Sequence, residues 1–336
     1  EFSAGHPATA GGGALPGGIG WYRKTFTLDA KDQEKMIYID FDGVYRNSKV
    51  WINGHLLGER PYGYISFRYD LTPYLRFGKE ENQIAVRVDN SRQPNSRWYS
   101  GSGIYRNVWM VKTTGIHVSQ WGTYITTPAV REEKSEIQIA VSLENNTGNK
   151  GNITLITDIY DPFNTKVGTV IADTSLDGNS SLTVTERLEI KKPQLWSVKT
   201  PSLYTAVTRV QINLKDMDEY RTVFGIRDFL FDSAKGFFLN GEPLKINGVC
   251  NHHYLGCLGA AVNTRALERQ LEILKGMGCN AIRTSHNPPA PELLDLCDRM
   301  GFIVMDEAFD MWKKNKTPFD YGLNWDEWHE RDLKDF

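Results

Sequence analysis

The last hundred residues of the chain repeat one pattern three times, in which a short apolar stretch ends in a cluster of polar residues and a helical segment follows. The apolar stretches, of which the first is expected to form a strand at residues 244–249, end in polar clusters at residues 251–253, 283–287 and 306–307. Strands that alternate with helices predict a parallel sheet, and a (β/α)8 barrel begins in this way. Barrels of this kind keep their chemistry at the carboxyl ends of the strands. The three polar clusters are therefore the candidate functional site.

The length of this region is too small for a complete barrel. A complete barrel takes about 250 residues, whereas only three strand–helix units fit between residue 227 and Phe336, the last residue. We therefore expect the chain to be the front part of a larger enzyme. The start at Glu1, which runs directly into a glycine-rich stretch, is typical of a cut edge and not of a signal peptide.

Two helices are expected between the three strands. Apolar residues recur at helical spacing from Leu267 onward, and we expect Thr264 to be the N-cap and Gly278 to lie just past the end. The second helix is expected to start at Pro291 and to end at Gly301. Short connections between these elements agree with a parallel sheet.

The first two thirds of the chain have the pattern of two β-sandwiches. Residues 1–114 contain several short alternating stretches, and an Asn53-Gly54 pair predicts a tight hairpin turn, so we expect a jelly roll. Residues 115–226 alternate again and have the length of an immunoglobulin-like sandwich. This second sandwich concentrates no catalytic residue types, and we interpret it as a spacer.

Composition limits the classes of partner. The formal charge is −2 with no long basic run, which argues against nucleic acid and anionic membranes as partners, and no apolar stretch is long enough to span a membrane. The four cysteines lack CxxC spacing, which argues against a zinc site, and Cys279 and Cys297 are expected to be buried thiols. Cysteine usage leaves the compartment open between cytoplasm and periplasm. We expect a periplasmic or secreted protein.

The polar clusters favour some chemistries over others. His252 and His253 are adjacent and should point to opposite sides, which argues against a metal-dependent barrel hydrolase. Arg283 follows an apolar strand, so it needs a carboxylate or an anionic ligand, and Asp306 or Glu307 could pair with it. A structural ion pair and direct contact with a substrate are equally compatible with this pattern.

The paired carboxylates Asp306 and Glu307 do not suit the acid/base pair of a glycosidase. Retaining hydrolysis needs two carboxylates about 5–5.5 Å apart on different strands, which consecutive residues cannot provide. Three tryptophans follow, and their faces could stack on sugar rings, although packing is the favoured interpretation. They are Trp312, Trp325 and Trp328.

Five motifs resemble segments of glycoside hydrolase family 2, the group of β-galactosidases, β-glucuronidases and β-mannosidases. The motifs are GWYRKTF at residues 20–26, SGSGIYRNVW at 100–109, FLNGEP at 238–243, AIRTSHNPP at 281–289 and MDEA at 305–308. The resemblance covers essentially the whole chain. It implies the family's domain order, namely a sugar-binding-like jelly roll (1–114), an immunoglobulin-like sandwich (115–226) and the first three β/α units of a TIM barrel (227–336).

The resemblance also implies a mechanism and a set of site residues. The family uses a retaining double displacement with one Glu after the fourth strand and another after the seventh, so both are expected after Phe336 and this chain alone should be inactive. No cofactor is required, although a cation or a homo-oligomer in the full-length protein would be compatible. The implied substrate-binding residues are His252, Arg283, His286, Asn287 and, from the jelly roll, Asn95, with Asp306 and Glu307 as pocket support.

One position departs from the family pattern. Relatives usually carry an Asp after the paired histidines, where this chain has Tyr254, which cannot supply a negative acceptor at neutral pH. The motifs most resemble the β-galactosidase branch, so a terminal β-galactoside or a β-linked oligosaccharide is the expected substrate. A β-glucuronide or a β-mannoside is the alternative within the family. A non-catalytic carbohydrate-binding protein, with its affinity in residues 1–114, is the alternative from another class.

Overall fold

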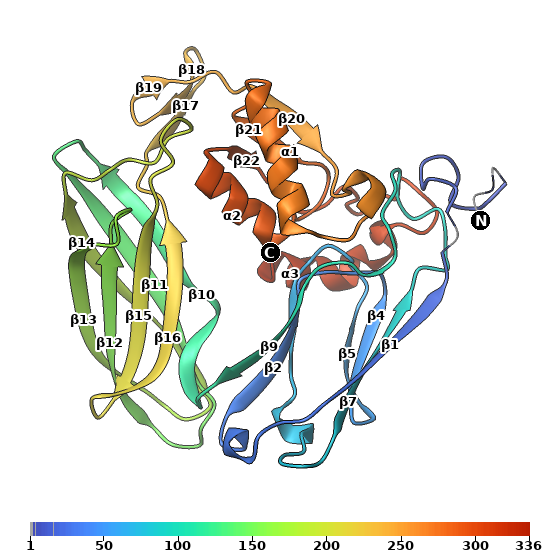
Figure 1. The fold of residues 1–336 in the computed structure, drawn as a ribbon, viewed down its shortest axis with the longest axis horizontal. Helices are drawn as coiled ribbons and strands as arrows, with labels where there is room; N and C mark the ends of the chain where they lie inside the picture. The colour runs from blue at the N-terminus through green and yellow to red at the C-terminus, as the bar shows by residue number, and fades with distance from the viewer. Residues whose placement is uncertain (1–2, 4, 16) are drawn as a thin grey trace.

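The order of folded units along the chain is jelly roll, immunoglobulin-like sandwich and three β/α units of a TIM barrel (Figure 1). The computed structural model describes residue 3, residues 5–15 and residues 17–336. Among the helices of these residues, none combines the length and the apolar character that crossing a membrane requires.

The jelly roll packs a four-stranded sheet, in the order β1-β7-β4-β5, against a three-stranded sheet, in the order β6-β2-β9. Alternate residues of the strands face the interior, such as Val50 and Ile52 of β4 and Val86 of β7, all almost fully buried. The predicted hairpin is present, because β4 and β5 are joined through Asn53 and Gly54, which both have positive φ. The strands are β1 (Ile19–Phe26), β2 (Met36–Phe41), β3 (Val44–Tyr45), β4 (Ser48–Ile52), β5 (His55–Arg60), β6 (Phe67–Asp70), β7 (Asn82–Asp89), β8 (Gly103–Ile104) and β9 (Val108–Thr113).

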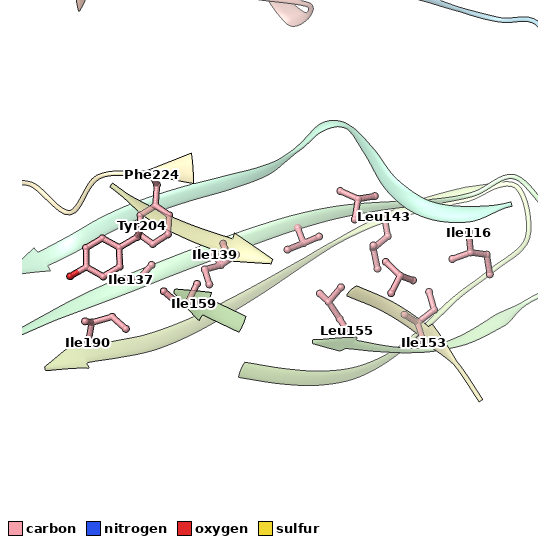
Figure 2. Packing of buried hydrophobic residues seen from close by; sticks show 14 of the residues in the cluster. Ile116, Ile137, Ile139, Leu143, Ile153, Leu155, Ile159, Ile190, Tyr204 and Phe224 are labelled. Carbon is pink, nitrogen blue, oxygen red and sulfur yellow. The ribbon is translucent and has the colours of Figure 1, made fainter. Parts of the chain in front are cut away.

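The immunoglobulin-like unit is a sandwich of a three-stranded sheet, β10-β11-β14, and a four-stranded sheet, β13-β12-β15-β16. Its core is made of inward-facing aliphatic residues from both sheets, and Figure 2 shows Ile137 and Ile139 of β11 beside Ile159 of β12. The clean alternation of β11 in the sequence is thus the alternation of a half-buried strand. The strands are β10 (Ile116–Val130), β11 (Lys134–Asn145), β12 (Gly151–Tyr160), β13 (Lys166–Leu176), β14 (Ser180–Lys191), β15 (Tyr204–Ile212) and β16 (Lys215–Phe224).

The barrel units form a parallel sheet in the order β20-β21-β22, preceded by a small antiparallel sheet, β17-β18-β19. The helices α1 and α2 pack together over the parallel sheet, and Figure 1 shows them on one side of it. The elements are β17 (Phe229–Asp232), β18 (Gly236–Leu239), β19 (Glu242–Pro243), β20 (Gly248–Asn251), α1 (Thr264–Gly276), β21 (Ala281–Thr284), α2 (Pro291–Met300), β22 (Ile303–Met305) and α3 (Trp325–Lys334).

Two local predictions in this region were wrong in detail. The first parallel strand was expected at residues 244–249 but starts at Gly248, because the backbone of Leu244 still pairs with Phe237 in the preceding hairpin. The N-cap of α1 is Asn263 and not Thr264, because the Asn263 side chain accepts a hydrogen bond from the amide of Ala266. Both Asn and Thr cap helices well, so composition alone did not separate them.

The other helix signals and the buried thiol were correct. Pro291 is the first residue of α2, and Gly301 ends that helix in the left-handed conformation. Cys297 is fully buried on the inner face of α2, whereas Cys279, also expected to be buried, is only half-buried. All four cysteines are free thiols.

Candidate active site at the strand ends

The site begins with the register of the parallel strands. Cys250 of β20 lies beside Arg283 of β21, which lies beside Met305 of β22. Because the strands are parallel, the residues that follow them meet at one edge of the sheet. The three polar clusters of the sequence therefore converge there, as predicted.

A charged triangle occupies this edge. Nε and Nη2 of Arg283 both lie 2.5 Å from Oε1 of Glu307, and Oε2 of Glu307 lies 3.0 Å from Nδ1 of His286. The third side is the 3.2 Å contact between Nη2 of Arg283 and Nδ1 of His286. The expectation that Arg283 needs a carboxylate is therefore confirmed, and its partner is Glu307. Nη1 of Arg283 contacts only the Cys250 sulfur, at 3.6 Å, among the described atoms.

Asp306 supports the triangle through hydrogen bonds to Thr284 and, from there, to the backbone of Glu307. Its Oδ1 accepts a hydrogen bond from the Thr284 hydroxyl at 2.8 Å, and that hydroxyl in turn accepts one from the amide of Glu307 at 3.1 Å. Burial raises the pKa of the Asp306 carboxyl. These bonds fix the backbone from which the Glu307 side chain projects. Asp306 therefore holds the backbone, whereas Glu307 pairs with Arg283.

The two adjacent histidines point in different directions, as their spacing predicted. The ring of His252 lies 5.6 Å from that of His286, and burial, followed by the nearby His286, lowers its pKa. His253 turns toward the jelly roll, where its Nε2 lies 3.1 Å from the carbonyl of Ser100, and burial lowers its pKa to about 4. Both imidazoles are therefore neutral at neutral pH, and only His252 belongs to the site.

A jelly-roll tryptophan completes the wall, and the sequence reasoning had not assigned it to the site. The Trp98 ring lies 5.3 Å from His252 and 5.5 Å from His286, and its side chain is almost fully buried. Its neighbour Arg97 donates a hydrogen bond to Asp310, 2.7 Å away, in the loop after β22. The available signal was an aromatic residue three positions after Asn95, in a loop already expected to reach the barrel.

Asn95 itself is enclosed within the jelly roll. Its Oδ1 accepts a hydrogen bond from the Tyr45 hydroxyl at 2.8 Å, and its Nδ2 donates to Asn90 and to the carbonyl of Arg92, each at 2.7 Å. With its amide committed to protein atoms, Asn95 holds the shape of the loop that carries Trp98. A substrate contact by Asn95 remains a prediction.

Among the described residues, no hydrogen bond joins the Asn287 side chain to the charged triangle. Asn287 is 3% exposed and lines a small cavity together with Asn251, Ser285 and the site residue His252. Its Nδ2 has no hydrogen-bond partner among the described residues. The structure thus brings together His252, Arg283, His286 and Glu307, and it leaves Asn287 and Asn95 outside that group.

Two further features frame the site. Tyr254, at the position where an acid was expected, is 42% exposed, and its ring lies 6.0 Å from that of His252. Within the part of the chain that the structure describes, no group of three His, Cys, Asp or Glu residues is arranged to hold a metal ion.

A jelly roll, an immunoglobulin-like sandwich and β/α units with a polar cluster at the strand ends define a modular TIM-barrel protein. Family models agree unit by unit: the sugar-binding domain of glycosyl hydrolases family 2 matches residues 14–114, the family 2 model matches 116–227 and the family 2 TIM-barrel domain matches 232–325. The chain belongs to glycoside hydrolase family 2.

Individual relatives point the same way. The β-galactosidase BoGH2A of Bacteroides ovatus is 59% identical over 336 residues, which are 100% of this chain and 39% of that protein. A putative β-glucuronidase of Formosa agariphila is 45% identical over 97% of this chain and 31% of its own length. A crystal structure of a family 2 member from Bacteroides cellulosilyticus superposes with a TM-score of 0.97 at 42% identity, over 99% of this chain and 43% of that one. The chain thus spans less than half the length of these relatives.

Proposed function

We propose that the protein is a retaining glycoside hydrolase that cleaves terminal β-galactosides, with the wall of its glycosyl subsite built by this chain. The observation that carries the proposal is the Arg283–Glu307–His286 triangle at the carboxyl ends of parallel barrel strands. The similarity to a relative named as a β-galactosidase supports the choice of sugar. The two catalytic glutamates of the double displacement would follow Phe336 in the full-length protein.

The site residues have distinct proposed roles. Arg283 binds Glu307 through Nε and Nη2, which leaves Nη1 for a charge-assisted hydrogen bond to a catalytic carboxylate or to the substrate. Neutral His252 can offer its Nε2 to a sugar hydroxyl, as donor or acceptor, because its Nδ1 is buried. His286, held by Glu307, would donate or accept at a neighbouring hydroxyl. Asp306 and Glu307 act as supports for these groups.

The proposed roles of Asn287 and Asn95 depend on fewer contacts than those of the other site residues. Asn287 lines one cavity with His252, and its Nδ2 has no partner among the described residues, so we propose that it contributes to substrate binding on that side of the pocket. Asn95 acts through the jelly-roll loop, whose Trp98 packs against both site histidines. The substrate is a β-linked oligosaccharide or glycoside.

A substrate panel tests the proposal. Chromogenic β-galactoside, β-glucuronide and β-mannoside are offered to the 336-residue chain and to the full-length protein. We expect the full-length protein to cleave the β-galactoside and the chain alone to cleave none of the three. Preferred cleavage of the glucuronide would show that the substrate is a β-glucuronide and not a β-galactoside. If the full-length protein cleaved none of the three substrates, a carbohydrate-binding protein would be favoured.

A variant of Arg283 tests the role of the triangle. In the full-length protein, Arg283→Ala should lower kcat/KM by about 100-fold or more, because a positioned charged donor is lost where charge develops in the transition state. Arg299→Ala, which removes an arginine with a 61% exposed side chain on α2, is the matched control and should leave kcat/KM unchanged. Unchanged kinetics in Arg283→Ala, with the fold intact, would remove Arg283 from the site.

A further inference from the structure

We propose that Trp312 is a stacking platform for a sugar ring in the leaving group of the substrate, beside the glycosyl subsite. This inference rests on the proposed function and extends it from the sugar that is cleaved off to the sugar that departs. It assigns a role to an exposed tryptophan that neither the charged triangle nor the domain packing uses.

The first observation is a stack of three aromatic rings. Trp312 lies 5.4 Å from Trp325 with an interplanar angle of 20°, and Trp325 lies 4.6 Å from His329 with an angle of 13°. Within the residues of this chain Trp312 is nevertheless 66% exposed, so Trp325 covers one face of its indole ring and no part of this chain encloses the side chain. No other ring of the described residues stacks on the opposite face, which is the open face in this chain.

The second observation is that Trp325, on which Trp312 stacks, is itself packed against other aromatic rings. Trp325 packs against the interface cluster of jelly-roll and barrel aromatics and lies edge-on to Phe309, with ring centroids 5.1 Å apart. Phe309 in turn stacks on Tyr321 at 5.3 Å with an angle of 6°. The packed Trp325 ring favours one orientation of the Trp312 ring, which would lower the side-chain entropy lost on binding.

The third observation is the position of Trp312 beside the site. It lies in the loop that follows β22, at the carboxyl end of the sheet where the triangle also lies. Asp310 and Met311, the two residues before it, line one small cavity together with His286 and Trp98. Because Trp312 directly follows these two residues in the chain, we place the platform next to the wall that would hold the glycosyl unit.

The loop is also anchored at this position. Oδ1 of Asp310 accepts hydrogen bonds from Arg97 at 2.7 Å and from Lys316 at 2.8 Å, and the Asp310 side chain is 5% exposed. The carbonyl of Ala308 accepts a hydrogen bond from the Tyr62 hydroxyl at 2.6 Å. Contacts from the jelly roll thus fix both the loop and the tryptophan that it presents.

The chemistry of the open face selects the ligand class. An indole face is flat and apolar with a negative quadrupole, and it complements the slightly positive C–H groups on one face of a pyranose ring. A sugar ring linked to the glycosyl unit would extend outward from the enclosed wall toward the rim of the site. The geometry points to a neutral pyranose in the leaving group as the occupant.

Two substrates with one glycosyl group separate this subsite from the chemistry. The leaving group of lactose is a pyranose, whereas that of β-galactosyl fluoride is a fluoride ion without a sugar ring. Only lactose can therefore use the platform. In the full-length protein, Trp312→Ala should lower kcat/KM for lactose about tenfold, which corresponds to about 1.4 kcal/mol, and leave that for the fluoride unchanged. Trp312→Phe should retain most of the activity on lactose. If the panel identifies another sugar, the disaccharide and the fluoride of that sugar replace these two.

The matched control is Phe163→Ala, which removes a 75% exposed aromatic ring from the immunoglobulin-like unit. It should leave kcat/KM unchanged for both substrates. Equal kcat/KM for lactose in wild type and Trp312→Ala would overturn the platform while leaving the proposed function intact. Equal losses on both substrates would also overturn it, because Trp312 would then act on the fold or on the chemistry. A wild-type protein that cleaves no glycoside in the panel would overturn the proposed function and this inference together.

Discussion

Glu186 is an acidic residue in the wrong environment for its charge. It lies on β14 between the inward-facing Val184 and Leu188, and it is 7% exposed. Neither of its carboxylate oxygens has a hydrogen-bond partner among the described residues, and burial raises its pKa. A buried carboxyl without a partner costs free energy, so this residue should weaken the immunoglobulin-like core.

Replacing Glu186 by leucine should therefore stabilise the protein at pH 7, by about 1–3 kcal/mol. Because the folded-state pKa is raised, the folded protein binds the proton more tightly, and the stability present below the unfolded pKa is lost as pH rises through the folded value. The advantage of Glu186→Leu should accordingly shrink at pH 4.5. Denaturant midpoints of both proteins at the two pH values measure this.

The control for this prediction is on the same strand. Glu189→Leu removes a carboxylate that is exposed and pairs with Lys134, so it should show no pH-dependent gain. An advantage of Glu186→Leu that is the same at both pH values would mean that shape, and not ionisation, determines the effect.

Single-residue reasoning from the sequence reached part of the site. The expectation that Arg283 pairs with a carboxylate follows from its position after an apolar strand, where an unpaired guanidinium would be costly to bury. The choice of Glu307 over Asp306 does not follow, since it depends on Thr284 engaging Asp306 across the neighbouring strand. Trp98 was missed as a site residue because its contacts with the histidines join segments that are far apart in the sequence.

The segment after β21 is held from outside the barrel by Arg106. This buried arginine of the jelly roll donates to the carbonyls of Asp42 and Tyr64 on its own side, at 3.2 and 3.0 Å. It also donates to the carbonyls of Pro289 and Pro288 across the interface, at 3.0 and 2.7 Å. These two prolines directly follow the loop that carries His286, so Arg106 fixes the direction in which that loop leaves the strand.

Arg106→Ala should loosen this loop as well as destabilise the interface. Four carbonyls would lose their donor, which we expect to cost about 2–4 kcal/mol of unfolding free energy and at least about tenfold in kcat/KM of the full-length protein. Hydrogen exchange of the amides at residues 285–287 measures the loop directly. Arg187→Ala, an exposed arginine on β14, is the control. Unchanged exchange at these amides would show that the loop holds its position without Arg106.

Element boundaries were predictable where local chemistry dictates them. Asn53-Gly54, Pro291 and Gly301 each impose a backbone conformation that few other residues favour, and each stands where expected. The start of β20 was not predictable in this way. Pairing across the preceding hairpin keeps Leu244 out of the parallel sheet, and such pairing is a property of two segments and not of one.

The arrangement of the units depends on contacts that no local pattern encodes. The helix α3 packs on the jelly roll, and Figure 1 shows it lying between that unit and the barrel strands. Arg60 of β5 and Asp332 of α3 form a buried ion pair of 2.9 Å across this contact, and Asp332 also accepts from the Tyr321 hydroxyl. The sequence contains both residues but gives no sign that they meet, because 272 positions separate them.

Removing one charge of the Arg60–Asp332 pair should have a different effect on stability from removing both charges. Burial raises the pKa of Asp332 even with Arg60 beside it, so the charged carboxylate depends on its partner. Arg60→Met should therefore cost about 3–5 kcal/mol of unfolding free energy, because it leaves the buried charge of Asp332 without compensation. The double variant Arg60→Met/Asp332→Leu should recover most of that loss, since it removes both charges and keeps apolar volume at the contact.

Denaturant unfolding of wild type, Arg60→Met, Asp332→Leu and the double variant measures the coupling between Arg60 and Asp332. The surface pair Lys313–Asp326, whose side chains are 77% and 75% exposed, lies in the same part of the chain, and its removal should change stability by less than about 1 kcal/mol. A double variant as unstable as the sum of the single variants would mean that the pair does not act as a unit. The jelly roll and α3 would then be held together by the aromatic cluster around Tyr62 and Tyr321, which packs across the same contact.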